Sequence, residues 1–155
     1  TSTQAGNDLK NIKNNSHLIS RLPTVCKKPA RAINLGVDAL FAFNSADLLP
    51  TGAVQLNSFV SEFKAQMPQV SALRVTGHTD SLGEAGYNEK LSLARASSIA
   101  KYLELAGVGV PLAVEGRGER EPVSRGCDRF AQDRASMITC LQPDRRVVIE
   151  LINRN

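Results

Sequence analysis

The sequence predicts an α/β (α+β) sandwich in which helices pack on one mixed β-sheet. Three observations lead to this prediction. Segments with strand-like alternation and segments with helical spacing follow one another along the chain. The length of 155 residues suits a single hydrophobic core, and 42% hydrophobic against 22% charged residues is typical of globular proteins. No apolar run approaches the ~18 residues that span a bilayer.

The net positive charge lies in residues 1–30, which hold five basic residues and one acidic residue and therefore the whole net charge of +4. This segment is polar and is predicted to be a flexible basic linker, with the folded domain in residues 31–155. Aromatic residues make up 5% of the chain, so platforms for stacking bases are scarce. Nucleic acid is not an expected partner.

The first half of the domain contains two predicted strands and one predicted helix. Loose alternation over residues 33–43 indicates a first strand that ends in a turn at Asn44-Ser45. Helical spacing of apolar residues over 51–67 predicts a helix, which Pro68 stops. Residues 70–76 then form a second predicted strand.

The second half repeats this alternation. The clearest helix of the sequence covers residues 87–106 and ends at Gly107. A short strand is predicted at 112–114, a further helix at 130–141 and a last buried strand at 146–152.

The predicted helix 87–106 has an apolar face that polar residues interrupt in its first turns. Asn88 and Arg95 fall in the middle of this face, and Ser92 falls near its edge. A guanidinium does not give up its charge, so burying it without an anion would cost several kcal/mol. Arg95 is therefore expected to have an anionic partner, supplied by the protein or by a ligand.

Asp80 is the best internal candidate for that partner, because it follows a predicted strand and precedes the same helix. Ligands tend to bind beyond the carboxyl ends of strands and near helix N-termini. Asp80 and Arg95 together suit a zwitterion, with its carboxylate on Arg95 and its ammonium on Asp80. A structural salt bridge between the two residues is the competing interpretation.

Four motifs together resemble one known family. They are Gly77-His78-Thr79-Asp80, Tyr87-Asn88-x-x-Leu91-Ser92-x-x-Arg95-Ala96-x-x-Ile99, Gly116-Arg117-Gly118-Glu119 and Pro143-Asp144-Arg145-Arg146-Val147. In this order, over residues 33–152, the chain resembles the OmpA-like C-terminal domain. This peptidoglycan-associating module also occurs in Pal-type lipoproteins and MotB-type stator proteins.

The resemblance implies a periplasmic β/α domain that anchors an outer-membrane or envelope protein to the cell wall. Its partner would be peptidoglycan, bound non-covalently through the diaminopimelate of the peptide stem, with no cofactor and no enzymatic activity. A membrane would be reached only through a part that this chain lacks. The sequence itself leaves the oligomeric state open, with a homodimer as one possible state.

The resemblance also assigns residues. Asp80 and Arg95 match the pair that holds the zwitterionic end of diaminopimelate, Asn88 matches an assisting position, and Asn44 is a weaker candidate for the wall of the site. Of the paired arginines Arg145 and Arg146, one could line the site, but a structural pairing is favoured. Leu82 departs from the family, since many relatives have a polar residue there, and an auxiliary hydrogen bond would be lost.

The chain has three cysteines. In an oxidising periplasm, Cys127 and Cys140 would close a loop worth ~3 kcal/mol of stability, and family variants that end in Pro-Asp-Arg-Arg carry a similar pair. Cys26 is then left over, either as a thiol or paired outside the domain.

Two alternatives to wall anchoring remain open at this point. One is a protein-interaction module of an envelope complex in which the Asp80–Arg95 pair is structural. The other is a hydrolase of wall peptides, which is disfavoured because the sequence has no Gly-x-Ser-x-Gly elbow.

A metal site is not expected, because the sequence has only two histidines, His17 and His78, and no Cys-x-x-Cys pair. His78 is expected to brace the Gly77 loop by hydrogen bonds.

Overall fold

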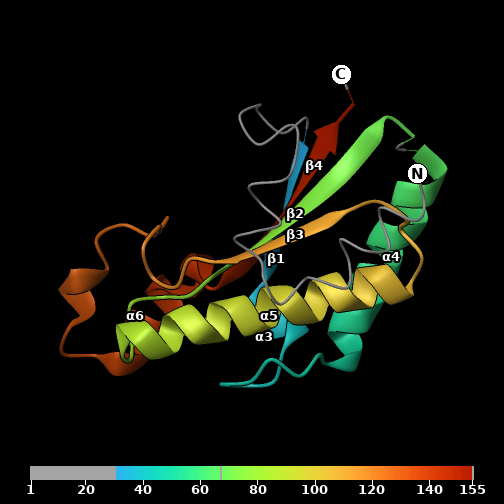
Figure 1. Ribbon diagram of the computed structural model, residues 1–155. Coiled ribbons are helices and arrows are strands. Elements are labelled where there is room, and N and C mark those ends of the chain that lie inside the picture. Colours follow the sequence, from blue (N-terminus) through green and yellow to red (C-terminus); the bar gives the residue numbers. More distant parts are fainter. Residues whose placement is uncertain (1–30, 67, 155) are drawn as a thin grey trace.

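A four-stranded mixed sheet forms the centre of the computed structural model, which describes residues 31–66 and 68–154 (Figure 1). The spatial order of the strands is β1 (Arg31–Gly36), β4 (Arg146–Asn153), β2 (Val70–His78) and β3 (Leu112–Gly116). Strand β4 runs antiparallel to both of its neighbours, whereas β2 and β3 run parallel.

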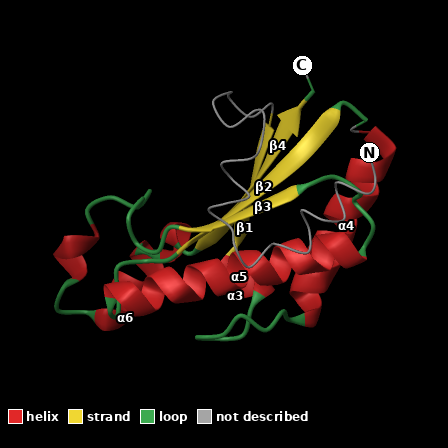
Figure 2. Cartoon of the chain, in the orientation of Figure 1, coloured by secondary structure: helices red, strands yellow, loops and turns green. Residues whose placement is uncertain are grey.

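Two long helices, α4 (Pro50–Gln66) and α5 (Ala85–Leu105), cover one face of this sheet (Figure 2). The short helix α3 (Val37–Leu40) follows β1, and α6 (Arg134–Cys140) lies in a segment beyond the end of the sheet (Figure 1). The predicted sandwich of helices on one mixed sheet is therefore confirmed. No helix in the described part of the chain is long and apolar enough to cross a membrane.

The core lies between the sheet and these helices. Strand β4 buries alternate residues along Val147, Ile149 and Leu151, as period-two alternation requires. Strand β2, which lies between β4 and β3, is buried over most of its length and contributes Leu73 and Val75 to the core. Helix α5 contributes apolar residues from its later turns, and α4 contributes Leu56 and Phe63. Met67, the last apolar residue of the predicted helix 51–67, lies outside the described residues.

Two glycines allow α5 to lie directly against the strand ends. Gly77 of β2 and Gly116 of β3 are register partners. A Cβ on Gly77 would collide with the carbonyl oxygen of Ser92, and a Cβ on Gly116 would lie 2.5 Å from the backbone nitrogen of Leu93. This close approach brings the first turns of α5, with their polar residues, to the carboxyl end of β2.

The predicted strand 33–43 is wrong in its second half. Strand β1 ends at Gly36, and the chain then forms helix α3, in which the backbone nitrogen of Phe41 donates to the carbonyl of Val37. The buried residues Val37, Leu40 and Phe41 have helical spacing that also fits part of an alternating pattern. The predicted turn follows, with Asn44 at a left-handed φ of 54°.

The predicted helix 130–141 is divided into shorter pieces. A 3-10 turn, η2 (Cys127–Phe130), comes first, and α6 begins only after Asp133, whose side chain accepts a hydrogen bond from the backbone nitrogen of Ser136. A second 3-10 turn, η3 (Gln142–Asp144), leads into β4. Asp133 favours a helix start at this point because it satisfies a backbone donor of the first turn.

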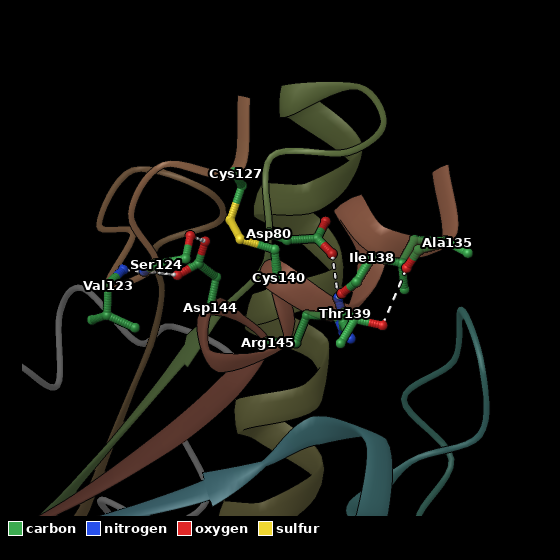
Figure 3. The surroundings of a disulfide bond; sticks show 10 residues. All are labelled: Asp80, Val123, Ser124, Cys127, Ala135, Ile138, Thr139, Cys140, Asp144 and Arg145. Carbon is green, nitrogen blue, oxygen red and sulfur yellow. Dashed lines mark hydrogen bonds and ion pairs between the residues drawn. A yellow bond between two sulfur atoms is a disulfide. The ribbon is translucent and has the colours of Figure 1, made fainter. Parts of the chain in front are cut away.

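The predicted disulfide between Cys127 and Cys140 is present, with a Cα–Cα distance of 5.7 Å (Figure 3). It closes residues 127–140 into a loop that we call the insert. The buried carboxylate of Asp144, after the insert, accepts hydrogen bonds from the backbone nitrogens of Val123 and Ser124, before it, at 2.7 and 2.8 Å. The leftover Cys26 lies outside the described residues.

The disulfide should contribute measurably to stability. In the chain-entropy picture, the 13-residue separation corresponds to about 3 kcal/mol, and reduction should lower the melting temperature by roughly 10 °C. Circular dichroism melts of the Cys26→Ser variant, with and without a reductant, check this, since that variant has no third thiol for exchange. An unchanged midpoint would show that the bridge does not stabilise the domain.

The close approach of α5 to β2 gives a second prediction. Gly77→Ala should lower the free energy of unfolding by about 1–3 kcal/mol, because the new methyl group meets backbone atoms that cannot move away alone. Gly36→Ala is the matched control, since its Cβ would have an ordinary 3.8 Å contact with Gln142. Urea unfolding of both variants compares them, and equal stabilities would contradict the proposed backbone contact.

Candidate functional site

A cleft of about 520 Å³ opens at the carboxyl end of β2, beside the first turns of α5. Its walls come from α3 and the turn after it, the loop 79–83, helix α5, the insert and Arg145, the residue before β4. All four residues that the sequence analysis put forward as ligand-binding line this cleft, namely Asn44, Asp80, Asn88 and Arg95. The charged residues of the lining are Asp38, Asp80, Arg95, Arg134 and Arg145.

Arg95 is buried, with 6% of its surface exposed. Its Nε donates a hydrogen bond to the carbonyl of Ser45 at 2.8 Å, and its guanidinium carbon lies 5.7 Å from the centre of the Phe41 ring. Burial lowers the pKa of Arg95, and the nearby acidic groups only partly oppose this effect. Within the described part of the chain, its two terminal nitrogens make no hydrogen bond or ion pair. They are donors that a guest in the cleft could use.

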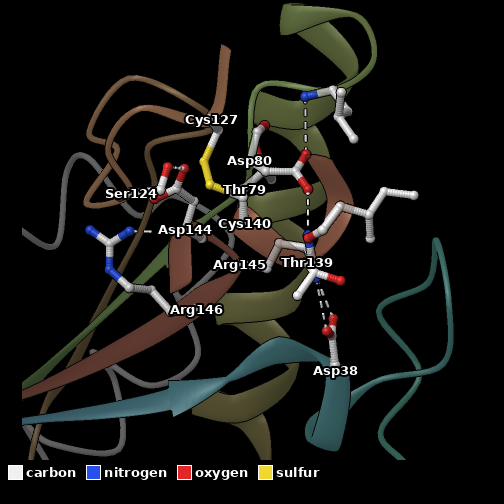
Figure 4. A network of polar contacts seen from close by, with 12 residues as sticks. Asp38, Thr79, Asp80, Ser124, Cys127, Thr139, Cys140, Asp144, Arg145 and Arg146 are labelled. Carbon is white, nitrogen blue, oxygen red and sulfur yellow. Dashed lines mark hydrogen bonds and ion pairs between the residues drawn. A yellow bond between two sulfur atoms is a disulfide. The ribbon is translucent and has the colours of Figure 1, made fainter. Parts of the chain in front are cut away.

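Asp80 is paired with Arg145, not with Arg95 (Figure 4). Its Oδ2 accepts from Nη1 of Arg145 at 2.8 Å, and its Oδ1 accepts from the backbone nitrogen of Leu82 at 3.0 Å. The structural salt bridge between Asp80 and Arg95, which was the competing interpretation, is therefore contradicted. The sequence did not identify the true partner, because Arg145 lies 65 positions further along the chain.

Arg145 joins three walls of the cleft. Its Nε and Nη2 donate to the two carboxylate oxygens of Asp38 at 3.2 and 3.1 Å, and its Nη1 also donates to the carbonyl of Ile138 at 3.1 Å. Burial opposes the charge of Arg145, but the bonds to Asp38 and Asp80 outweigh burial and raise its pKa. Both carboxylates of the cleft thus bond to one guanidinium.

The two asparagines support the rims of the cleft. Asn88 is buried, and its amide nitrogen donates to the carbonyl of Leu82 at 2.9 Å and to Glu119 at 3.1 Å. It therefore holds the loop that carries Asp80. Asn44 accepts a hydrogen bond from the hydroxyl of Tyr87 at 2.6 Å. Leu82, the departure from the family pattern, adds apolar surface to the lining.

Arg146 and His78 lie outside the lining of the cleft. Arg146 donates to the backbone carbonyls of Asp144 and Glu121, so of the two paired arginines only Arg145 contributes to the cleft. His78 is 4% exposed, and its Nδ1 is buried without a hydrogen-bond partner.

The expected bracing role of His78 is therefore wrong, because its side chain makes no hydrogen bond to any described residue. Burial, followed by the charge of Arg146, lowers the pKa of His78 to about 4, so the imidazole is neutral at pH 7. Within residues 31–66 and 68–154, no group of three or more His, Cys, Asp or Glu side chains could hold a metal ion.

Alignments with known proteins of similar sequence cover most of this chain. The chain is 40% identical over 116 residues to outer membrane protein A of Shimwellia blattae, an alignment that covers 74% of this chain and 48% of that protein. The chain spans between 33% and 48% of the length of the curated relatives that it matches.

Solved structures agree with the fold. The cell wall anchor of the T6SS from Pseudomonas aeruginosa is 26% identical, with a TM-score of 0.60 and coverage of 79% of this chain and 81% of that chain. The peptidoglycan-associated lipoprotein from Burkholderia pseudomallei is 25% identical, with a TM-score of 0.55 and coverage of 84% and 92%. The model of the OmpA family matches residues 40–138, and the chain therefore belongs to the OmpA family.

Proposed function

We propose that this domain binds peptidoglycan non-covalently, through the diaminopimelate of the peptide stem, and anchors an outer-membrane or envelope protein to the cell wall in the periplasm. The observation that carries the proposal is the buried residue Arg95, which lines a cleft together with Asp80 and whose terminal nitrogens have no partner among the described residues.

The chemistry of the cleft fits a zwitterion. Arg95 can bind a carboxylate with two parallel hydrogen bonds, which is the strongest geometry available to a guanidinium. A carboxylate accepts about four hydrogen bonds, so Asp80 can receive an ammonium group in addition to Arg145 and the backbone of Leu82. The free end of diaminopimelate carries one carboxylate and one ammonium on the same carbon, which matches the two kinds of charge that Arg95 and Asp80 bring to the cleft.

The relatives support the same proposal. One structural neighbour is named a cell wall anchor, and another is named a peptidoglycan-associated lipoprotein. The curated relatives are outer membrane proteins, which favours a position in the cell envelope.

Hydrolysis of wall peptides has less support from the same cleft. Its lining, as far as the chain is described, contains no serine, cysteine or histidine, and the hydroxyl of Thr79 donates to the backbone carbonyl of Asp80. A nucleophile activated by a neighbouring base would need such a pair of side chains.

Removing the charged side chain of either Asp80 or Arg95 should abolish binding to the cell wall without unfolding the domain. Asp80→Ala and Arg95→Ala are expected to stay in the supernatant when purified sacculi are pelleted, whereas the wild-type protein sediments with them. Lys101→Ala is the control, because it removes an exposed charge from α5, the helix that carries Arg95. This variant should sediment normally. Normal sedimentation of both cleft variants would refute the site.

The distal carboxylate of the ligand should carry much of the affinity. A stem peptide with lysine in place of diaminopimelate lacks this carboxylate, and it should bind at least ten-fold more weakly. This corresponds to a loss of ~1.4 kcal/mol or more in binding free energy. Isothermal titration calorimetry with the two peptides measures the difference. Equal affinities would show that Arg95 does not hold this group.

A further inference from the structure

The insert brings a third guanidinium to the cleft. Arg134 is the first residue of α6, lines the cleft and is exposed. It makes no ion pair with any residue that the structure describes. Ile138 lies four positions further on the same helix and also lines the cleft. Residues four apart share one face of a helix, so this face of α6 is the one turned to the cleft.

The charges of the cleft do not balance. Its two carboxylates, those of Asp38 and Asp80, both bond to Arg145. Two further guanidiniums, those of Arg95 and Arg134, share the lining with them. The zwitterionic end of diaminopimelate is neutral overall and brings one carboxylate, which Arg95 would bind. Arg134 is then still available for another anion.

We propose that Arg134 binds a second carboxylate on the same stem peptide, so that the cleft prefers stems in which this group is free over stems in which it is an amide. The inference rests on the proposed function and adds a specificity-determining residue to it. A carboxylate is the anionic group that stem peptides offer, and guanidinium groups bind carboxylates with matching planar geometry.

The insert is held in a defined position relative to the rest of the cleft. The disulfide joins its two ends, and the carbonyl of Ile138 accepts from the same Nη1 of Arg145 that donates to Asp80 (Figure 3). Asp80 and the helix that carries Arg134 are thus connected through one guanidinium. This connection fixes the backbone of α6 beside the zwitterion site, so that a ligand of limited length could reach both.

The test uses three synthetic tripeptides, L-Ala-γ-D-Glu-meso-diaminopimelate, each with the distal zwitterionic end intact. In the first, the glutamate α-carboxyl and the main-chain diaminopimelate carboxyl are both amides. In the second only the glutamate carboxyl is free, and in the third only the main-chain carboxyl is free. The last two distinguish the two sources of a second carboxylate.

Calorimetric titration should give the wild-type protein an affinity about two- to five-fold higher for one of the two acidic peptides than for the doubly amidated one, as expected for an exposed ion pair. Arg134→Gln should remove this preference and leave the affinity for the doubly amidated peptide unchanged. Raising the ionic strength should reduce the preference in the wild-type protein.

Arg125→Gln is the matched control. It removes an exposed positive charge two positions before the insert, from a residue that is outside the lining of the cleft. It should keep the preference, and an equal loss in this variant would overturn the inference in favour of a general effect of net charge.

The outcomes separate the two proposals. If the wild-type protein binds none of the three peptides, the proposed function fails. If it binds all three equally, or if Arg134→Gln keeps the preference, only the role of Arg134 is refuted. A Cys127→Ser/Cys140→Ser variant that still binds the doubly amidated peptide should also lose the preference, and its retention would contradict the positioning role of the insert.

Discussion

Arg145 bonds to both carboxylates of the cleft, and the character of the site depends on this arrangement. A single guanidinium is shared by Asp38 from α3 and Asp80 from the loop after β2, while its Nη1 also reaches a carbonyl of the insert. Because Arg145 satisfies the acidic groups, Arg95 is left with a backbone carbonyl and an aromatic ring as its partners among the described residues. The cleft therefore has positive charge to offer to a guest.

The backbone contacts of α5 explain why a cation can be buried at this place. Gly77 and Gly116 allow the helix to lie against the strand ends, where Ser92 donates to a carbonyl of its own helix and accepts from the backbone nitrogen of Gly118. The first turns of the helix thus face loop backbone groups that can form hydrogen bonds, instead of the apolar side chains that cover its later turns. Asn88 and Ser92 are then satisfied by bonds to these loops and to their own helix, whereas Arg95 bonds to a loop carbonyl through its Nε alone among the described residues.

Much of the fold and part of the site could be predicted from the sequence. The helix around Arg95 has a local signal, its periodicity over five turns, and the disulfide follows from two cysteines placed as in similar members of the family. The first strand was predicted too long because Val37 and Phe41, four positions apart, fit both the strand period and the helix period over so short a segment. The pairing of Asp80 with Arg145 could not be derived, since it depends on β4 lying between β1 and β2. Strand order is a property of the whole sheet that no local pattern records.

The two ends of a bound zwitterion would meet different conditions. An ammonium group at Asp80 has to share a carboxylate that already has Arg145 and a backbone nitrogen as donors. A carboxylate at Arg95 would meet a guanidinium that is already buried and held by Ser45 and Phe41. Preorganisation of this kind reduces the entropy that binding would otherwise cost. Burial disfavours the charge of Arg95, and an anion bound there would offset part of this cost, so under the proposed function the carboxylate would contribute more to specificity than the ammonium.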